Sequence, residues 1–192
     1  MAAGRDEIGP LRRREAVNAL APSLPGRAPS RRRVAEVAED HLDDVYRYLL
    51  MLTADAATAE DLAAETFEKA FRSWRRYDPR RSSERTWLCR VARSVALDHF
   101  RAESRRRRRE ERYAGEAGAG EGAPLEPGWS PQLEEALRSL TAAEREVVAL
   151  RIVLDLDAEA AARVLGIGRT ACSMRLARAL AKLEEGMTGA GA

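Results

Sequence analysis

The sequence predicts an all-α fold made of two small helical domains joined by a flexible linker. Aromatic residues are only 5% of the 192 residues, and alanine and leucine dominate the apolar set, which suits helices better than strands. Apolar residues recur at spacings of three and four in two separate parts of the chain. Between these parts lies a stretch rich in glycine, alanine and proline, which disfavours packing and gives reach.

These patterns divide the chain into four parts. Residues 1–33 contain four prolines and two arginine triplets with few apolar side chains, so we expect a disordered basic N-terminal extension. The first domain is expected over residues 34–102 and the linker over residues 103–130. The second domain is expected over residues 131–187.

The first domain is predicted to contain three helices. Their expected ranges are 34–53, 56–77 and a third from Glu84 past Arg101. Asp55 is a suitable N-cap for the second helix, and Pro79 disfavours its continuation. A short loop, residues 78–83, then leads into the third helix.

The second domain has the pattern of a helix-turn-helix. A short helix ends near Leu140, and the segment Thr141 to Glu144 has the capping-box sequence that opens a helix reaching Leu154. The last two helices, expected over 158–165 and 169–183, are joined by a glycine-containing turn. Two short helices joined in this way are typical of DNA-binding domains.

A net charge of +2 conceals two oppositely charged segments. Residues 34–66 contain nine acidic side chains and one arginine, whereas residues 69–101 contain ten basic side chains and three acidic ones. Such segregation predicts one surface for a protein partner and another for a polyanion, although two solvated faces would look the same.

The third helix and the loop before it are the candidate site for nucleic acid. Helical spacing places Arg90, Arg93 and Arg101 on one face, opposite the apolar stripe. The loop and first turn add further arginines and hydroxyls, which can bind phosphates and base edges: Arg80, Arg81, Ser82, Ser83 and Arg85. Trp87 could stack on unpaired bases, but it could equally belong to the core, as we expect for Trp74.

The last helix is the second candidate site for DNA. Its expected outward side chains include Thr170, Ser173, Met174 and Arg178, while Arg169 and Arg175 flank them and suit phosphate contacts. A plain amphipathic surface helix is the alternative. The inward set is expected to be Cys172, Leu176, Ala179, Leu180 and Leu183.

Several classes of function are disfavoured. Asp61 and Glu65 share a helix face, but no histidine, nucleophile or set of metal ligands accompanies them, so a docking surface for a basic partner fits better than catalysis. Cys89 and Cys172 lie far apart, which argues against a metal or disulfide, and inert buried thiols are expected. We expect no enzyme activity, cofactor or metal, no membrane span, no secretory signal and a cytoplasmic location.

Three segments carry a family resemblance. Residues 59–67, AEDLAAETF, and 86–101, which contain TWLCRVAR and ALDHFR, resemble region 2 of bacterial RNA polymerase sigma factors. Residues 140–183 are similar to region 4. With a loose linker between the regions, the plan resembles the extracytoplasmic-function (ECF) group.

The resemblance implies partners and residue roles. Core RNA polymerase would be bound through its β′ coiled coil and β subunit, with Asp61, Glu65, Thr66 and Phe67 at the coiled coil. The loop and third helix would hold the melted −10 element, and the last helix would read the −35 element. An anti-sigma factor is implied as a further partner.

The chain departs from the family pattern in the helix-turn-helix. Residues 160–161 and 171–174 lack the usual side chains, and Ser173 stands where a long basic residue is common. Since one good base contact is worth roughly 1–3 kcal/mol, weak or unusual −35 recognition is predicted. A stand-alone helix-turn-helix regulator that binds duplex DNA as a dimer is the alternative function.

Overall fold

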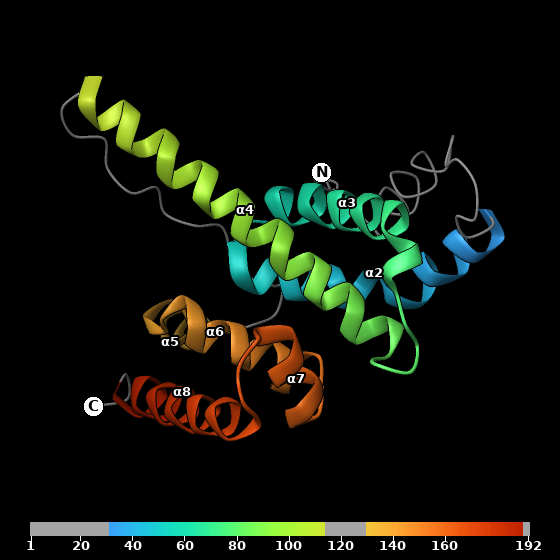
Figure 1. Cartoon of the computed structure of the whole chain (residues 1–192). Helices are drawn as coiled ribbons and strands as arrows, with labels where there is room; N and C mark the ends of the chain where they lie inside the picture. The colour runs from blue at the N-terminus through green and yellow to red at the C-terminus, as the bar shows by residue number, and fades with distance from the viewer. Residues whose placement is uncertain (1–30, 114–129, 190–192) are drawn as a thin grey trace, which may run out of the picture.

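In a computed structural model, the structure describes residues 31–113 and 130–189, and every regular element in these two ranges is a helix (Figure 1). The all-α prediction is therefore confirmed. The disordered extension was expected over residues 1–33, but residues 31–33 are helical and begin the first helix, so that prediction is wrong for them. Residues 1–30 and 114–129, where the rest of the extension and of the linker were predicted, lie outside the described residues.

The first bundle packs three helices against one another, α2 (Arg31–Thr53), α3 (Ala56–Arg72) and α4 (Glu84–Tyr113). Its core contains fully buried side chains from all three, including Val45, Phe67 and Leu88. Asp55 caps α3 as predicted, because its carboxylate accepts a hydrogen bond of 2.7 Å from the Thr58 backbone.

The end of α3 comes earlier than predicted. The α-helix ends at Arg72 and is followed by a short 3-10 turn, η1 (Trp74–Arg76), rather than running to residue 77. The Ser73 hydroxyl donates a 2.7 Å hydrogen bond to the Lys69 carbonyl, and the Ser73 backbone nitrogen is shared between two carbonyls. This side chain competes with the regular helical pattern.

Helix α4 is longer than the sequence analysis predicted. The expectation of a linker from residue 103 is wrong for residues 103–113, which continue the helix to Tyr113. Residues 102–113 contain neither glycine nor proline and are mostly arginine and glutamate, both good helix formers. The arginine run indicated solvent exposure, which does not exclude a helix.

The second bundle comprises α5 (Pro131–Ser139), α6 (Ala142–Val148), α7 (Ala158–Leu165) and α8 (Arg169–Gly189). The capping box is confirmed: Thr141 accepts from the Glu144 backbone at 3.3 Å, and the Glu144 carboxylate accepts from the Thr141 backbone at 2.9 Å. Gly186 permits the close packing of α8 on α5, because a Cβ at this position would lie 3.1 Å from that of Ala136.

The helix predicted to run to Leu154 changes character halfway. After Val148 the chain forms a π-helical turn, η2 (Ala149–Val153), in which the Leu154 nitrogen donates to the Ala149 carbonyl at 2.9 Å. The wider turn buries Leu150 and Leu154 together, each at most 1% exposed. Hydrophobic spacing alone did not distinguish this turn from an α-helix.

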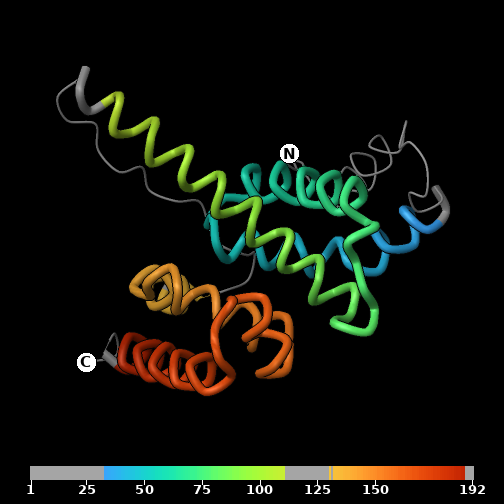
Figure 2. The backbone as a smooth tube through the Cα atoms, in the orientation of Figure 1, coloured from blue at the N-terminus to red at the C-terminus, as the bar shows by residue number. Residues whose placement is uncertain are grey.

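The two bundles lie against each other, as Figure 2 shows, and their buried residues form one continuous apolar core. Helix α2 contacts α6 and η2, and α4 contacts α7. The C-terminal part of α4 extends beyond both bundles.

Candidate nucleic-acid and polymerase surfaces

The acidic candidate surface lies on α3. Asp61 and Glu65 are exposed there, one helical turn apart. Thr66 and Phe67, predicted to bind alongside them, are both 0% exposed. The Thr66 hydroxyl instead donates a 2.7 Å hydrogen bond to the Leu62 carbonyl within the helix. Only the two carboxylates of the predicted set can therefore meet a partner in this conformation.

The loop of residues 78–83 presents two of its predicted arginines to solvent. Arg80 and Arg81 are exposed, and Arg81 lies 3.8 Å from the Asp78 carboxylate. Ser82 is half-buried. Ser83 is exposed, but its hydroxyl accepts a 3.2 Å hydrogen bond from the Thr86 backbone nitrogen and so caps the start of α4. Its predicted base-reading hydroxyl is thus engaged in holding the helix.

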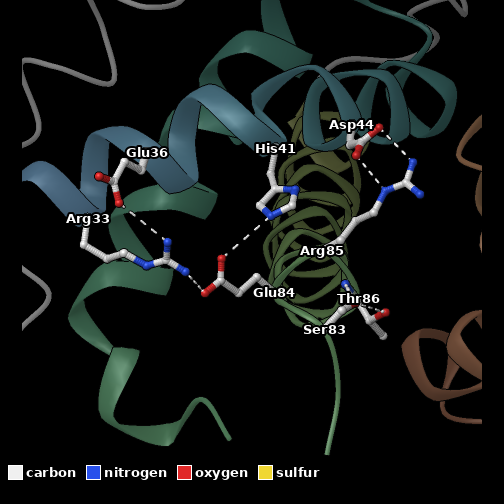
Figure 3. Close-up of polar contacts among 8 residues, drawn as sticks. All are labelled: Arg33, Glu36, His41, Asp44, Ser83, Glu84, Arg85 and Thr86. Atoms are coloured by element: carbon white, nitrogen blue, oxygen red, sulfur yellow. Dashed lines mark hydrogen bonds and ion pairs between the residues drawn. The ribbon is translucent and has the colours of Figure 1, made fainter. Parts of the chain in front are cut away.

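Polar side chains of α2 hold the first turn of α4 in place (Figure 3). Arg85, predicted to bind DNA, makes a bidentate ion pair with Asp44, at 2.6 and 2.9 Å. The neighbouring Glu84 bonds to Arg33 and lies 3.9 Å from the His41 ring nitrogen. The ion pair with Asp44 raises the pKa of the Arg85 guanidinium, mainly through its hydrogen bond. The same ion pair holds the Arg85 side chain against α2.

Trp87 is a core residue. It is 4% exposed, and its ring centroid lies 5.5 Å from that of Trp74 and 5.2 Å from that of Tyr77. The prediction that Trp87 stacks on unpaired bases is wrong for this conformation, because its neighbours already cover the ring. An aromatic cluster of this kind fixes the loop that connects α3 to α4.

The three arginines of the α4 face have different surroundings. Arg90 is exposed, and Arg101 is exposed with a 3.2 Å contact to Asp98. Arg93 instead donates a 2.7 Å hydrogen bond to the Glu146 carboxylate of the second bundle. Helical spacing correctly predicted that the three arginines share one side of α4. It could not indicate that Arg93 meets a carboxylate of the second bundle.

The helix-turn-helix consists of α7, a tight turn and α8. Asp157 caps α7 by accepting hydrogen bonds from the Glu159 and Ala160 backbones, which lower the pKa of its carboxyl. Gly166 ends α7 with φ of 69°, a left-handed conformation that favours glycine.

Most of the predicted −35 set faces solvent on α8. The exposed members are Arg169, Thr170, Ser173, Met174 and Arg178, whereas Arg175 is half-buried. Cys172 and Ala179 are fully buried, as the inward set predicts. Leu180 is 41% exposed, so its assignment to the inward set is wrong.

Glu146 is the residue that the sequence analysis missed. Its side chain is 7% exposed, and it accepts hydrogen bonds from the Tyr48 hydroxyl at 2.8 Å and from Arg93 Nε at 2.7 Å. Both donors belong to the first bundle. Burial, followed by the charge of Glu146, holds the pKa of Tyr48 well above its ordinary value, so the phenol remains the donor. One carboxylate therefore joins the two bundles.

The described residues offer no candidate metal site, exposed thiol or membrane-spanning helix. Those residues contain no group of three or more histidine, cysteine or carboxylate side chains that could hold a metal. Cys89 and Cys172 are buried free thiols, and burial raises the pKa of Cys89 to about 12. Within the described ranges, no helix combines the length and apolar character needed to cross a membrane.

Comparison with known families matches both halves. The family model for sigma-70 region 2 matches residues 37–106, and that for sigma-70 region 4 matches residues 130–183. The helical bundle therefore corresponds to region 2, and the helix-turn-helix domain to region 4, of the sigma-70 family.

Relatives narrow the assignment. The chain is 36% identical to the ECF sigma factor SigC of Mycobacterium tuberculosis over 138 residues, 71% of this chain and 73% of that protein. It is 34% identical to the ECF sigma factor BldN of Streptomyces coelicolor over 155 residues, 76% of this chain but only 58% of BldN. The chain belongs to the ECF sigma factors of bacterial RNA polymerase.

Solved structures show the same fold. The sigma factor RpoE of Bartonella quintana, in complex with the anti-sigma factor NepR, matches with a TM-score of 0.69 at 22% identity, covering 82% of this chain and 98% of RpoE. CnrH in complex with the cytosolic domain of CnrY matches with a TM-score of 0.60 at 20% identity, covering 94% of this chain and 98% of CnrH.

Proposed function

We propose that the protein binds core RNA polymerase in the cytoplasm and directs promoter-specific initiation, acting by binding and without catalysis of its own. The observation that carries the proposal is that the first bundle has both an acidic and a basic exposed surface. Exposed carboxylates on α3 suit a basic partner, and an exposed arginine loop with the Arg90 face of α4 suits DNA.

The proposed contacts follow from exposure. Asp61 and Glu65 would meet the β′ coiled coil, and Arg80, Arg81 and Arg90 would hold the opened −10 element. The exposed side of α8 would meet the −35 element, with the β subunit as a further contact of the second bundle. Ser173 is exposed at the DNA-facing position and carries no charge, which supports weak or unusual −35 recognition.

An anti-sigma factor is proposed as a regulatory partner, because the RpoE structure of the same fold contains one. A stand-alone helix-turn-helix regulator fits less well, since it would leave the acidic surface of α3 and the basic loop without a function.

The test is transcription with purified core polymerase. Wild-type protein is expected to co-purify with core enzyme and to give defined transcript starts. Charge reversal at Asp61→Lys with Glu65→Lys should abolish both, because it opposes the charge of the proposed partner. The matched control is Glu135→Lys, an exposed carboxylate on α5 whose side chain is 79% accessible. A wild-type protein without affinity for core polymerase would overturn the proposal.

A further inference from the structure

The C-terminal part of α4 projects beyond the packed bundles. Between residues 84 and 110 of this helix, Ala96 is the last buried side chain, and residues 104–110 are all exposed. Figure 1 shows this segment extending past the ends of α2 and α3. Its helical form is supported by ion pairs of Arg106 with Glu103 at 3.2 Å and with Glu110 at 3.6 Å. The protein thus carries an extended arm with little apolar surface.

One side of this arm continues the exposed arginine face of the bundle. At 100° per residue, Arg108 lies directly in line with Arg90, since 18 residues make five turns, while Arg101 and Arg105 deviate by roughly 20° and 60°. All four are exposed, and we call them the basic ridge. The ridge is about 27 Å long at a rise of about 1.5 Å per residue.

The ridge has charges available for a partner. Among the described residues, Asp98 contacts Arg101, whereas no carboxylate is paired with Arg90, Arg105 or Arg108. Exposed guanidinium groups along a rod suit a polyanion with phosphates along its length, since Arg pairs phosphates bidentately. The ridge has the length of about eight base pairs of duplex, at roughly 3.4 Å each.

We propose that the outer half of the basic ridge, Arg105 and Arg108, binds the phosphate backbone of the duplex between the −10 and −35 elements. The inference rests on the proposed function, which places opened −10 DNA at the loop and at Arg90. The second bundle follows α4 in the chain and would bind the −35 element, which lies upstream. A duplex that runs from the loop and Arg90 along α4 would have its phosphates beside the arm, which would add affinity without reading sequence.

The test compares two pairs of substitutions within the same arginine run. Arg105→Gln with Arg108→Gln removes two charges from the ridge, and glutamine keeps helix propensity. Arg106→Gln with Arg107→Gln removes two charges from other sides of the helix. The control pair also removes the ion pairs of Arg106, so any loss of helix would affect the control more.

Binding is measured for the reconstituted holoenzyme on two probes made from a promoter mapped by the transcription assay. One probe retains duplex upstream of the −10 element, and the other ends at its upstream edge. On the longer probe, the ridge pair should reduce affinity roughly tenfold and lower the slope of log affinity against log salt by about 1.8. The control pair should change both much less, and the shorter probe should not distinguish the pairs.

Each result is decisive. An equal loss for both pairs, or a loss for the ridge pair that persists on the shorter probe, overturns the ridge while leaving the proposed function intact. A wild-type holoenzyme that binds neither probe overturns the proposed function and the ridge with it.

Discussion

Trp87 illustrates how burial decides what a side chain can do. Flanking arginines made stacking on bases a reasonable prediction, yet the ring is packed edge-on against Trp74 and is 4% exposed. Its contribution is therefore to the stability of the bundle and to the position of the loop that presents Arg80 and Arg81.

Replacing Trp87 with alanine should destabilise the protein strongly. We expect Trp87→Ala to lower the free energy of unfolding by about 3–5 kcal/mol, as for other large aromatic residues deleted from cores. Arg90→Ala, one turn along α4 and exposed, should change it by less than about 0.5 kcal/mol. Urea unfolding followed by circular dichroism measures both, and a loss below 1 kcal/mol for Trp87→Ala would contradict the packing described.

At the residue scale, the sequence predicted those properties that depend only on neighbouring positions in the chain. The exposed carboxylates of α3 and the exposed arginines of the loop follow from charge and helical spacing. The contact between Tyr48 and Glu146 joins residues 98 positions apart, and nothing in either local sequence indicates the other. For the same reason, the engagement of Arg93 by Glu146 could not be predicted.

Among the elements, helix starts were predicted better than helix ends. Asp55 and Thr141 cap helices as expected, and Asp157 does the same at α7, because an N-cap is a property of one side chain and the next few backbone nitrogens. The end of α4 and the π-helical turn at η2 depend on competing backbone arrangements that sequence composition separates poorly.

The capping box of α6 gives a pH-dependent prediction. Glu144 bonds to Lys182 at 2.8 Å and to Thr141, and these partners lower the pKa of its carboxyl to about 2 from an ordinary 4.5. A lowered folded-state pKa stabilises the protein fully above the unfolded-state value, and that contribution disappears as the pH falls from about 4.5 toward about 2. Wild-type protein should therefore lose thermal stability over this window.

Glu144→Gln provides the comparison, because it removes this carboxylate while keeping its size. The difference in melting temperature between wild type and Glu144→Gln should be largest near neutral pH and shrink as the pH falls below 4. Calorimetry or circular dichroism across the pH range measures it, with Glu135→Gln as an exposed control on α5. A difference that is constant from pH 7 to pH 2 would show that the carboxylate is not held ionised by its partners.

At the scale of the whole molecule, the interface between the two bundles is mostly apolar and surrounds a cluster of polar side chains. Glu146 receives Tyr48 and Arg93 inside a continuous core that includes residues of α2, α4 and α7. This arrangement occupies Arg93, which lies on the helix proposed to hold opened DNA. The docked state therefore withholds one arginine that would be available if the bundles separated.

Removing the shared carboxylate should loosen this docking. Glu146→Ala leaves the Tyr48 hydroxyl and the Arg93 guanidinium without their acceptor, a change that typically costs about 2–5 kcal/mol when one partner of a buried charged pair is removed. Donor and acceptor dyes at Ala102→Cys and Glu185→Cys, both exposed positions, report the distance between the bundles. The native Cys89 and Cys172 are buried and should not be labelled.

Energy transfer should fall in the Glu146→Ala protein and stay near the wild-type value in Glu144→Ala, whose carboxylate bonds only within the second bundle. Both variants lose one carboxylate from the same short helix, so a general weakening of α6 would affect them equally. Equal transfer in wild type and Glu146→Ala would mean that apolar packing alone holds the bundles together. A selective fall would instead make Glu146 the contact that determines how far the two DNA-facing surfaces can separate.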